Sequence, residues 1–278
     1  MLCSPITLMN KWIKESVKLA NSSGYLDKLN EIYPVGGTFA RDIPEEKRKK
    51  IKRLIAKRDF KSLLPLLLSL ERFPIDDSYI GFIRKDNSAI SKNPKTIRRL
   101  KKILLGMGEK GIIAGASRPK SASRQLGQMF HNWLQNTGYP CLSADKFWAY
   151  RGTAVLKGGD NALRKFAHEK LGYEREKGLD LIIKVQNKFI IGEAKFISTG
   201  GGSQGGGFRE AINFVRQGGK NKNVIRVAVL DGVIWLVSEN KPKNKSRKTG
   251  LFSQVLSLNK NEIALSALLL KDFIKSQK

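Results

Sequence analysis

The sequence predicts an α/β (α+β) fold that follows a mainly helical N-terminal region, and two observations support this prediction. In residues 1–115, apolar side chains recur at helical spacing with lysines and arginines between them. In residues 116–278, amphipathic patterns of helical period alternate with short apolar runs of strand length. We therefore expect two domains, 1–115 and 116–278.

Three helices are expected in residues 43–111 of the N-terminal region. Residues 43–60 have Pro44 and two glutamates near their start and cations towards their end, as helix ends favour. Residues 61–73 are an apolar helix that bends or begins near Pro65. Residues 93–111 begin at an Asn-Pro pair and end at glycines. The basic face of this third helix suits phosphate groups, and a solvated face is the alternative.

The second half of the chain contains elements that alternate in type. They are expected as a helix from Ser123 to about Gln135, a helix in 160–173, strands at 178–185 and 188–196, a glycine-rich loop in 198–207, a helix at 208–217, strands at 223–230 and 233–239, and a final helix.

The chain is strongly basic, because its 278 residues contain 52 Lys and Arg against 24 Asp and Glu, for a net charge of +28. Its hydrophobic fraction of 41% and charged fraction of 27% are those of a globular protein and exclude a disordered chain. A nucleic acid is the polyanion that best matches this excess of positive charge. A basic soluble protein without a specific partner is the alternative.

Neither cysteine usage nor hydropathy indicates an exported or membrane protein. Cys3 and Cys141 lie far apart and match no disulfide framework or zinc site. The first residues lack the basic start and apolar centre of a signal peptide. The apolar runs at 63–70 and 263–270 are too short to span a bilayer. We therefore expect a soluble, cytoplasmic protein.

The segment 178–196, GLDLIIKVQNKFIIGEAKF, places three ionisable residues at the edges of two apolar strands. If Gln186 and the following asparagine form a two-residue hairpin turn, counting outward places Asp180 directly opposite Glu193. Lys195 then shares their face, because it follows Glu193 by two residues. A three-residue loop would shift the register and separate the carboxylates.

This arrangement suits metal-dependent attack on a phosphodiester. Two carboxylates near one point form a hard oxygen site for Mg²⁺, which also accepts phosphate oxygens. Lys195 would orient the attacking water or stabilise charge that develops on the phosphate. The alternative is a salt bridge between Glu193 and Lys195 at the edge of the strand.

Asp180, twelve residues, and then Glu193-Ala194-Lys195 resembles the D-(X)n-(D/E)-X-K signature of the PD-(D/E)XK nuclease superfamily. With SASRQLGQMFHNWL, HEKLGY and GGGSQGGGFREAINF around it, the segment resembles the type II restriction endonucleases of that superfamily. The resemblance covers residues 117–236 and does not extend to the N-terminal part. Gly178-Leu179 precedes the aspartate, where the superfamily name has a proline.

The resemblance implies a mixed central sheet flanked by helices, in a restriction-endonuclease-like core over residues 116–278. It implies that Asp180 and Glu193 bind Mg²⁺, that Lys195 is the catalytic lysine, and that Glu169 is an additional carboxylate. A solvent-facing position is the alternative for Glu169. The resemblance also implies a homodimer that cuts both strands of DNA, and a cognate DNA methyltransferase that protects the host site. The helical region 1–115 would bind DNA or mediate dimerisation.

Two segments are expected to contact double-stranded DNA. The glycine-rich loop would lie beside the scissile backbone, where glutamine suits adenine, arginine suits guanine and serine suits either a base or a phosphate. A second cluster, around the turn before residue 123, would hold phosphates. The residues are Ser203, Gln204, Arg209, Arg118, Lys120 and Arg124.

Three hypotheses follow from these features. The first is a Mg²⁺-dependent type II restriction endonuclease that hydrolyses double-stranded DNA at a specific sequence. The second keeps the same core in a Holliday-junction resolvase or a repair nuclease. The third is a non-catalytic DNA-binding protein in which the acidic pair is structural. Alanine at Asp180 or Lys195 separates them, since a catalytic role predicts that cleavage is lost while binding persists.

Overall fold

The structure is a computed structural model that describes residues 10–34, 40–119, 122–198, 202–219, 221–236 and 250–278, without the side chains of 122–124 and 202–203. Contacts divide the chain into two compact units. The larger, the sheet unit, combines residues 1–35 with 122–278, and the smaller, the helical unit, contains residues 36–121. This division differs from the two consecutive domains expected at 1–115 and 116–278, because residues 1–35 pack with the sheet and not with the helical unit.

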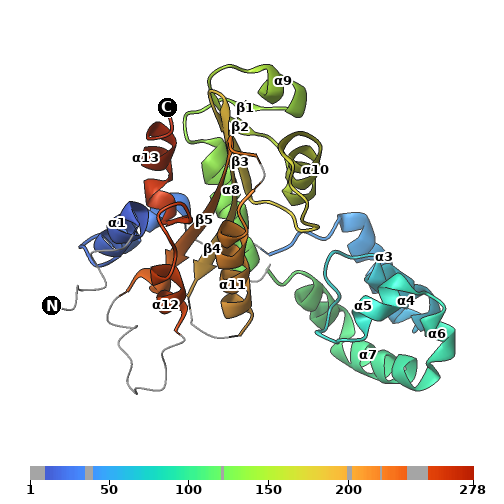
Figure 1. Cartoon of the computed structure of the whole chain (residues 1–278). Helices are drawn as coiled ribbons and strands as arrows, with labels where there is room; N and C mark the ends of the chain where they lie inside the picture. Colours follow the sequence, from blue (N-terminus) through green and yellow to red (C-terminus); the bar gives the residue numbers. More distant parts are fainter. Residues whose placement is uncertain (1–9, 35–39, 120–121, 199–201, 220, 237–249) are drawn as a thin grey trace. The chain divides into compact units, whose positions relative to one another are not determined.

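The sheet unit is built on six strands in the order β1-β2-β3-β4-β5-β6 (Figure 1). β1 and β2 are parallel, β3 is antiparallel to both of its neighbours, and β4, β5 and β6 are mutually parallel. The mixed sheet is thus confirmed. The strands are β1 Cys141–Leu142, β2 Thr153–Leu156, β3 Leu181–Val185, β4 Lys188–Ile197, β5 Val224–Gly232 and β6 Ile263–Leu265.

The register of the β3–β4 hairpin agrees with the count made from the sequence. Val185 pairs with Lys188 and Leu181 pairs with Gly192, so a two-residue turn joins the strands. Gln186 begins this turn with a φ of 55°, in the left-handed region. Asp180 and Glu193 are the next residues outward from the Leu181–Gly192 pair, so this register would place them opposite each other, and the backbone N–H of Asp180 donates to the Gly192 carbonyl at 2.9 Å.

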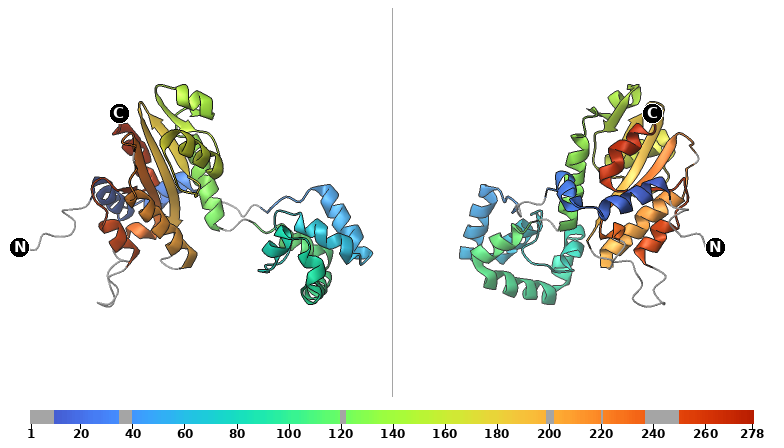
Figure 2. Two further views of the ribbon diagram at one scale, coloured as in Figure 1. Left: turned by 45° about the vertical axis from the view of Figure 1, so that its right-hand side comes forward. Right: turned by 90° about the vertical axis from the view of Figure 1, so that its left-hand side faces the viewer.

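Helices cover both faces of the sheet, as Figures 1 and 2 show. Alternation along β4 assigns Lys195 to the face of α11 and Phe196 to the face of α2. A Cβ built on Gly207 of α11 would lie 3.5 Å from Lys195 Cδ, and the ring of Phe196 packs against Tyr33. The helices are α1 Lys11–Ala20, α2 Tyr25–Ile32, α8 Ala122–Gln135, α9 Ala144–Ala149, α10 Asp160–Leu171, α11 Gly202–Arg216, α12 Leu251–Leu256 and α13 Leu270–Lys275.

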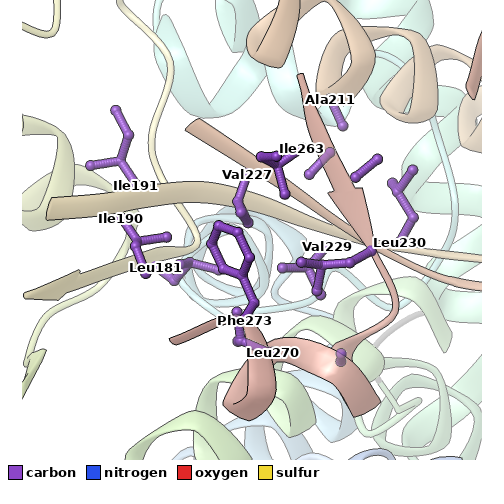
Figure 3. Packing of buried hydrophobic residues seen from close by; sticks show 14 of the residues in the cluster. Leu181, Ile190, Ile191, Ala211, Val227, Val229, Leu230, Ile263, Leu270 and Phe273 are labelled. Atoms are coloured by element: carbon purple, nitrogen blue, oxygen red, sulfur yellow. The ribbon is translucent and has the colours of Figure 1, made fainter. Parts of the chain in front are cut away.

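The core of the sheet unit lies between the strands and the helices that cover them. Figure 3 shows Phe273 and Leu270 of α13 beside Leu181, Ile190 and Val227, which come from three neighbouring strands. All five side chains are buried. Burial of such side chains contributes about 1.5–3 kcal/mol each, so α13 is held on the sheet mainly by apolar contact.

The helical unit has a separate hydrophobic core, which is why it forms a compact body of its own. Its longest helix is interrupted at Gly108, where φ is 62° and ψ is −176°, near the glycines that were expected to end it. The helices are α3 Glu45–Ala56, α4 Phe60–Leu68, α5 Ile80–Lys85, α6 Ala89–Lys92 and α7 Pro94–Ala116. The prediction of a helical N-terminal region is confirmed. Among the described residues, no helix combines the length and apolar composition needed to cross a membrane.

Two local predictions were wrong. The glycine-rich segment was expected to be a loop, but residues 202–207 form the first turns of α11. The strand expected at 233–239 begins instead as a single 3-10 turn, η2 Val233–Trp235, and residues 237–239 lie outside the described residues. Gly232 ends β5 with a φ of 93°, and the indole of Trp235 donates to the Leu230 carbonyl at 2.6 Å, which turns the chain away from the sheet.

Candidate active site

Asp180, Glu193 and Lys195 come together at the end of the β3–β4 hairpin. The Lys195 ammonium Nζ lies 2.8 Å from Asp180 Oδ2 and 3.9 Å from Glu193 Oε2. The backbone N–H of Ala194 also donates to Asp180 Oδ2, at 2.7 Å. The structure therefore brings together all three residues that the sequence selected, with the lysine between the two carboxylates.

Glu193 is fully buried, and two cations that the sequence analysis missed compensate its charge. Lys177 Nζ donates to Glu193 Oε2 at 2.6 Å, and Arg175 lies 3.5 Å from Oε1. A buried carboxylate without partners is costly, so these ion pairs explain how it remains in the core. Oε1 nevertheless accepts no hydrogen bond from the described residues.

Lys177 also bonds a third carboxylate, that of Glu210 in α11, at 2.7 Å. Burial lowers the pKa of Lys177, but hydrogen bonds to Glu193 and Glu210 outweigh it and hold that pKa above its ordinary value. The same hydrogen bond from Lys177 lowers the pKa of Glu210. The sequence gives little sign of the group formed by Lys177, Glu193 and Glu210. Glu210 lies in α11 and meets the other two residues only because α11 packs on the sheet.

Asp180 opens onto two hollows, whereas Glu193 lines neither. One is a cavity of about 370 Å³ whose lining includes Tyr33, Phe130, Asp180 and Lys195. The other, of about 380 Å³, is lined in part by Asp160 at the start of α10, together with Asp180. Asp180 is therefore reached from both hollows, whereas the buried Glu193 lies away from their linings.

The donors at this site fit Mg²⁺ better than a softer metal. Within the part of the chain that the structure describes, no three or more His, Cys, Asp or Glu residues are arranged to hold a metal ion. Mg²⁺ requires fewer protein ligands, since it keeps several waters and is often held by one or two carboxylates. Asp180 and Glu193 supply these oxygens, and the buried carboxylate of Glu193 already attracts the cationic side chains of Arg175 and Lys177.

Glu169 is placed away from this group. It lies in the last turn of α10, with its side chain half exposed and 4.0 Å from Lys165. Within the described residues it forms no hydrogen bond or ion pair with Asp180 or Glu193. The further carboxylates near the site are Glu210 and Asp160 instead, and the sequence analysis selected neither.

The residues expected to bind DNA have different placements. Gln204 is held by Ser198, whose backbone N–H donates to Gln204 Oε1 at 2.9 Å. Gln204 also lines the cavity of about 370 Å³ that Asp180 and Lys195 share. Arg209 is exposed on α11. Arg118 belongs to the helical unit and lies 3.7 Å from Asp76. Lys120 lies outside the described residues, as do the side chains of Arg124 in α8 and Ser203 in α11.

Comparison with known proteins gives a family match over nearly the whole chain. The model of the Tsp45I type II restriction enzyme family matches residues 10–277. No curated protein and no solved structure matches the chain.

Proposed function

Because this chain belongs to the Tsp45I type II restriction enzyme family, it is a site-specific endodeoxyribonuclease, and we propose that it hydrolyses double-stranded DNA by a Mg²⁺-dependent mechanism. The main support for this mechanism is the position of Lys195 Nζ, which lies 2.8 Å from Asp180 Oδ2 and 3.9 Å from Glu193 Oε2. An ammonium beside these two carboxylates supports the proposed PD-(D/E)XK assignment.

Asp180 and Glu193 would hold the metal through their carboxylate oxygens. When bound, Mg²⁺ polarises the phosphodiester and activates water. Glu193 is fixed by its burial and by Arg175 at its other oxygen, so it would be a rigid ligand. Asp180 is oriented by the Ala194 N–H and by Lys195, and it faces the open hollows.

Lys195 would act on the reacting phosphate or on the attacking water. Its ammonium is held by Asp180 and by the Ala194 carbonyl at 3.0 Å, so it is aimed before substrate arrives. A cation positioned in advance stabilises the charge that develops in the transition state without further reorganisation. The side chain also lines the cavity that Asp180 shares, which allows a phosphate to approach it.

DNA contacts are proposed on both units. Arg209 is exposed on α11, the helix that packs beside Lys195, and would contact a base or phosphate near the cut. Gln204 would read a base after giving up its bonds to Ser198. Ser203, Arg118, Lys120 and Arg124 are proposed as further phosphate or base contacts.

The helical unit is proposed as a DNA-binding body. Its 86 residues contain 22 Lys and Arg against 9 Asp and Glu, a denser positive charge than the rest of the chain carries. Such an excess favours binding to the phosphate backbone. We further propose that the enzyme acts as a homodimer, so that both strands are cut, and that a cognate DNA methyltransferase protects the host site.

Incubation with plasmid DNA tests the proposed function. In Mg²⁺ the protein should give discrete fragments, and sequencing of their ends should show one common sequence. With a chelator the plasmid should stay intact. Cleavage that continues in the chelator, or fragments without a common sequence, would refute the proposal.

A further inference from the structure

We propose that Lys177 occupies the metal-binding oxygen of Glu193 until the metal arrives, and that Glu210 receives the displaced ammonium. Lys177 and Glu210 would then be positioning residues that set the affinity of the site for its metal. The inference rests on the proposed function, because it takes Glu193 to be a metal ligand.

The two oxygens of Glu193 have different partners, and this difference identifies the blocked position. Arg175 pairs with Oε1 at 3.5 Å. Lys177 pairs with Oε2 at 2.6 Å, and Lys195 approaches the same oxygen at 3.9 Å while it binds Asp180. Oε2 is therefore the oxygen on the side of Asp180. A cation shared by Asp180 and Glu193 must use Oε2, where Lys177 now donates.

The charges around Glu193 give a reason for Lys177 to leave. Three cations lie within 4 Å of this one buried carboxylate, namely Arg175, Lys177 and Lys195. A divalent ion added beside Oε2 would repel all of them in a region with little water to screen the charges. The site thus favours loss of one cation as the metal binds.

Lys177 is the cation that can move and still keep a partner. Its Nζ already lies 2.7 Å from Glu210 Oε2, so it can leave Glu193 without becoming unpaired. Arg175 has its guanidinium 5.7 Å from the centre of the Phe214 ring, which restrains it. Lys195 is held by Asp180 and by the Ala194 carbonyl. A lysine on a flexible stem is also suited to exchange between two carboxylates.

The test measures metal binding without DNA, so that it does not depend on cleavage. Mn²⁺ is the probe, because it accepts the same oxygen ligands as Mg²⁺ and its free form is counted by electron paramagnetic resonance. The full-length proteins compared are wild type, Glu210→Gln, Lys177→Met and the double variant. Glu169→Gln is the matched control, since it removes the same charge from the surface of α10.

The proposal predicts opposite effects of the two single variants. Glu210→Gln leaves Lys177 on Glu193 and should weaken Mn²⁺ binding about fivefold or more, while Lys177→Met should strengthen it by a similar factor. In the double variant, loss of Glu210 should have no further effect, because Lys177 is absent. The half-exposed Glu210 can be changed without disturbing the core, so its effect stands even if Lys177→Met folds poorly.

Equal weakening by Glu210→Gln in the presence and absence of Lys177 would overturn the proposal, because Glu210 would then act on the metal directly. An effect no larger than that of Glu169→Gln would overturn it too. Two other results would instead contradict the proposed metal site itself. Wild type would bind no Mn²⁺, or Glu193→Gln would bind Mn²⁺ as tightly as wild type.

Discussion

Gly206→Ala tests whether the glycine-rich segment before residue 208 is helix, as in the structure, or the loop that its composition suggests. Gly206 is the fifth residue of α11, and a Cβ added to it would meet no atom within 4 Å. Alanine is favoured over glycine inside a helix by about 0.8–1 kcal/mol. We therefore expect the free energy of unfolding of the sheet unit to rise by about 1 kcal/mol.

The assay is urea unfolding followed by circular dichroism. With a denaturant slope of about 2–3 kcal/mol per molar for a unit of this size, the midpoint should rise by about 0.3–0.5 M. Gly218→Ala is the matched control, because it also has open space around its Cβ but a φ of 51°. A left-handed alanine costs about 1–2 kcal/mol, so this midpoint should fall.

A Gly206→Ala midpoint that stays unchanged or falls would refute the helical assignment, because alanine gains nothing in a mobile loop. The same sign of change for both variants would also refute it. DNA cleavage by Gly206→Ala should remain at the wild-type rate, since an ordered helix does not depend on glycine flexibility at this position.

Three other measurements test separate parts of the structure. Burial raises the pKa of Asp231 from 3.8 to about 7, so the folded chain keeps a proton that the unfolded chain releases in this range. The free energy of unfolding should therefore fall by up to about 4 kcal/mol as pH rises from about 4 to 7. In thermal melts, Asp231→Asn should lack this dependence on pH. The same pH dependence in both proteins would contradict the raised pKa of Asp231. Gln186→Gly should gain up to about 1 kcal/mol in urea unfolding by relieving the left-handed φ, whereas Asn187→Gly should lose about 0.5–1 kcal/mol, and equal effects would argue against this turn. Arg209→Ala should weaken DNA binding and reduce the slope of log affinity against log salt by about 1, and an unchanged slope would remove Arg209 from the interface.

The hairpin was predictable because its register depends on local features. Two apolar strands flank a two-residue turn, and the period of two along each strand fixes which side chains share a face. The prediction that the side chains of Asp180, Glu193 and Lys195 share one face follows from this register. The turn itself was the uncertain step, since Gln186 adopts a φ that glycine would adopt more readily.

The parts that could not be predicted depend on contacts between distant segments. The α11 glycines lower helix propensity and so favour a loop, but α11 packs on β4 and β5 with Gly205 buried, and these contacts hold the segment as a helix. The placement of α1 and α2 with the sheet depends on long-range hydrogen bonds, such as Tyr33 to Asp231 at 2.8 Å. A single sequence gives no sign of such pairing.

The measurement that tests the central claim most directly compares DNA cleavage and DNA binding by wild type and Lys195→Ala. Cleavage of plasmid DNA in Mg²⁺ should fall by about 10²–10³ in the variant, because Lys195 acts on charge that develops only in the transition state. Binding, measured without divalent metal, should stay close to that of wild type. Cleavage at the wild-type rate by Lys195→Ala would contradict a catalytic role for the group of Asp180, Glu193 and Lys195.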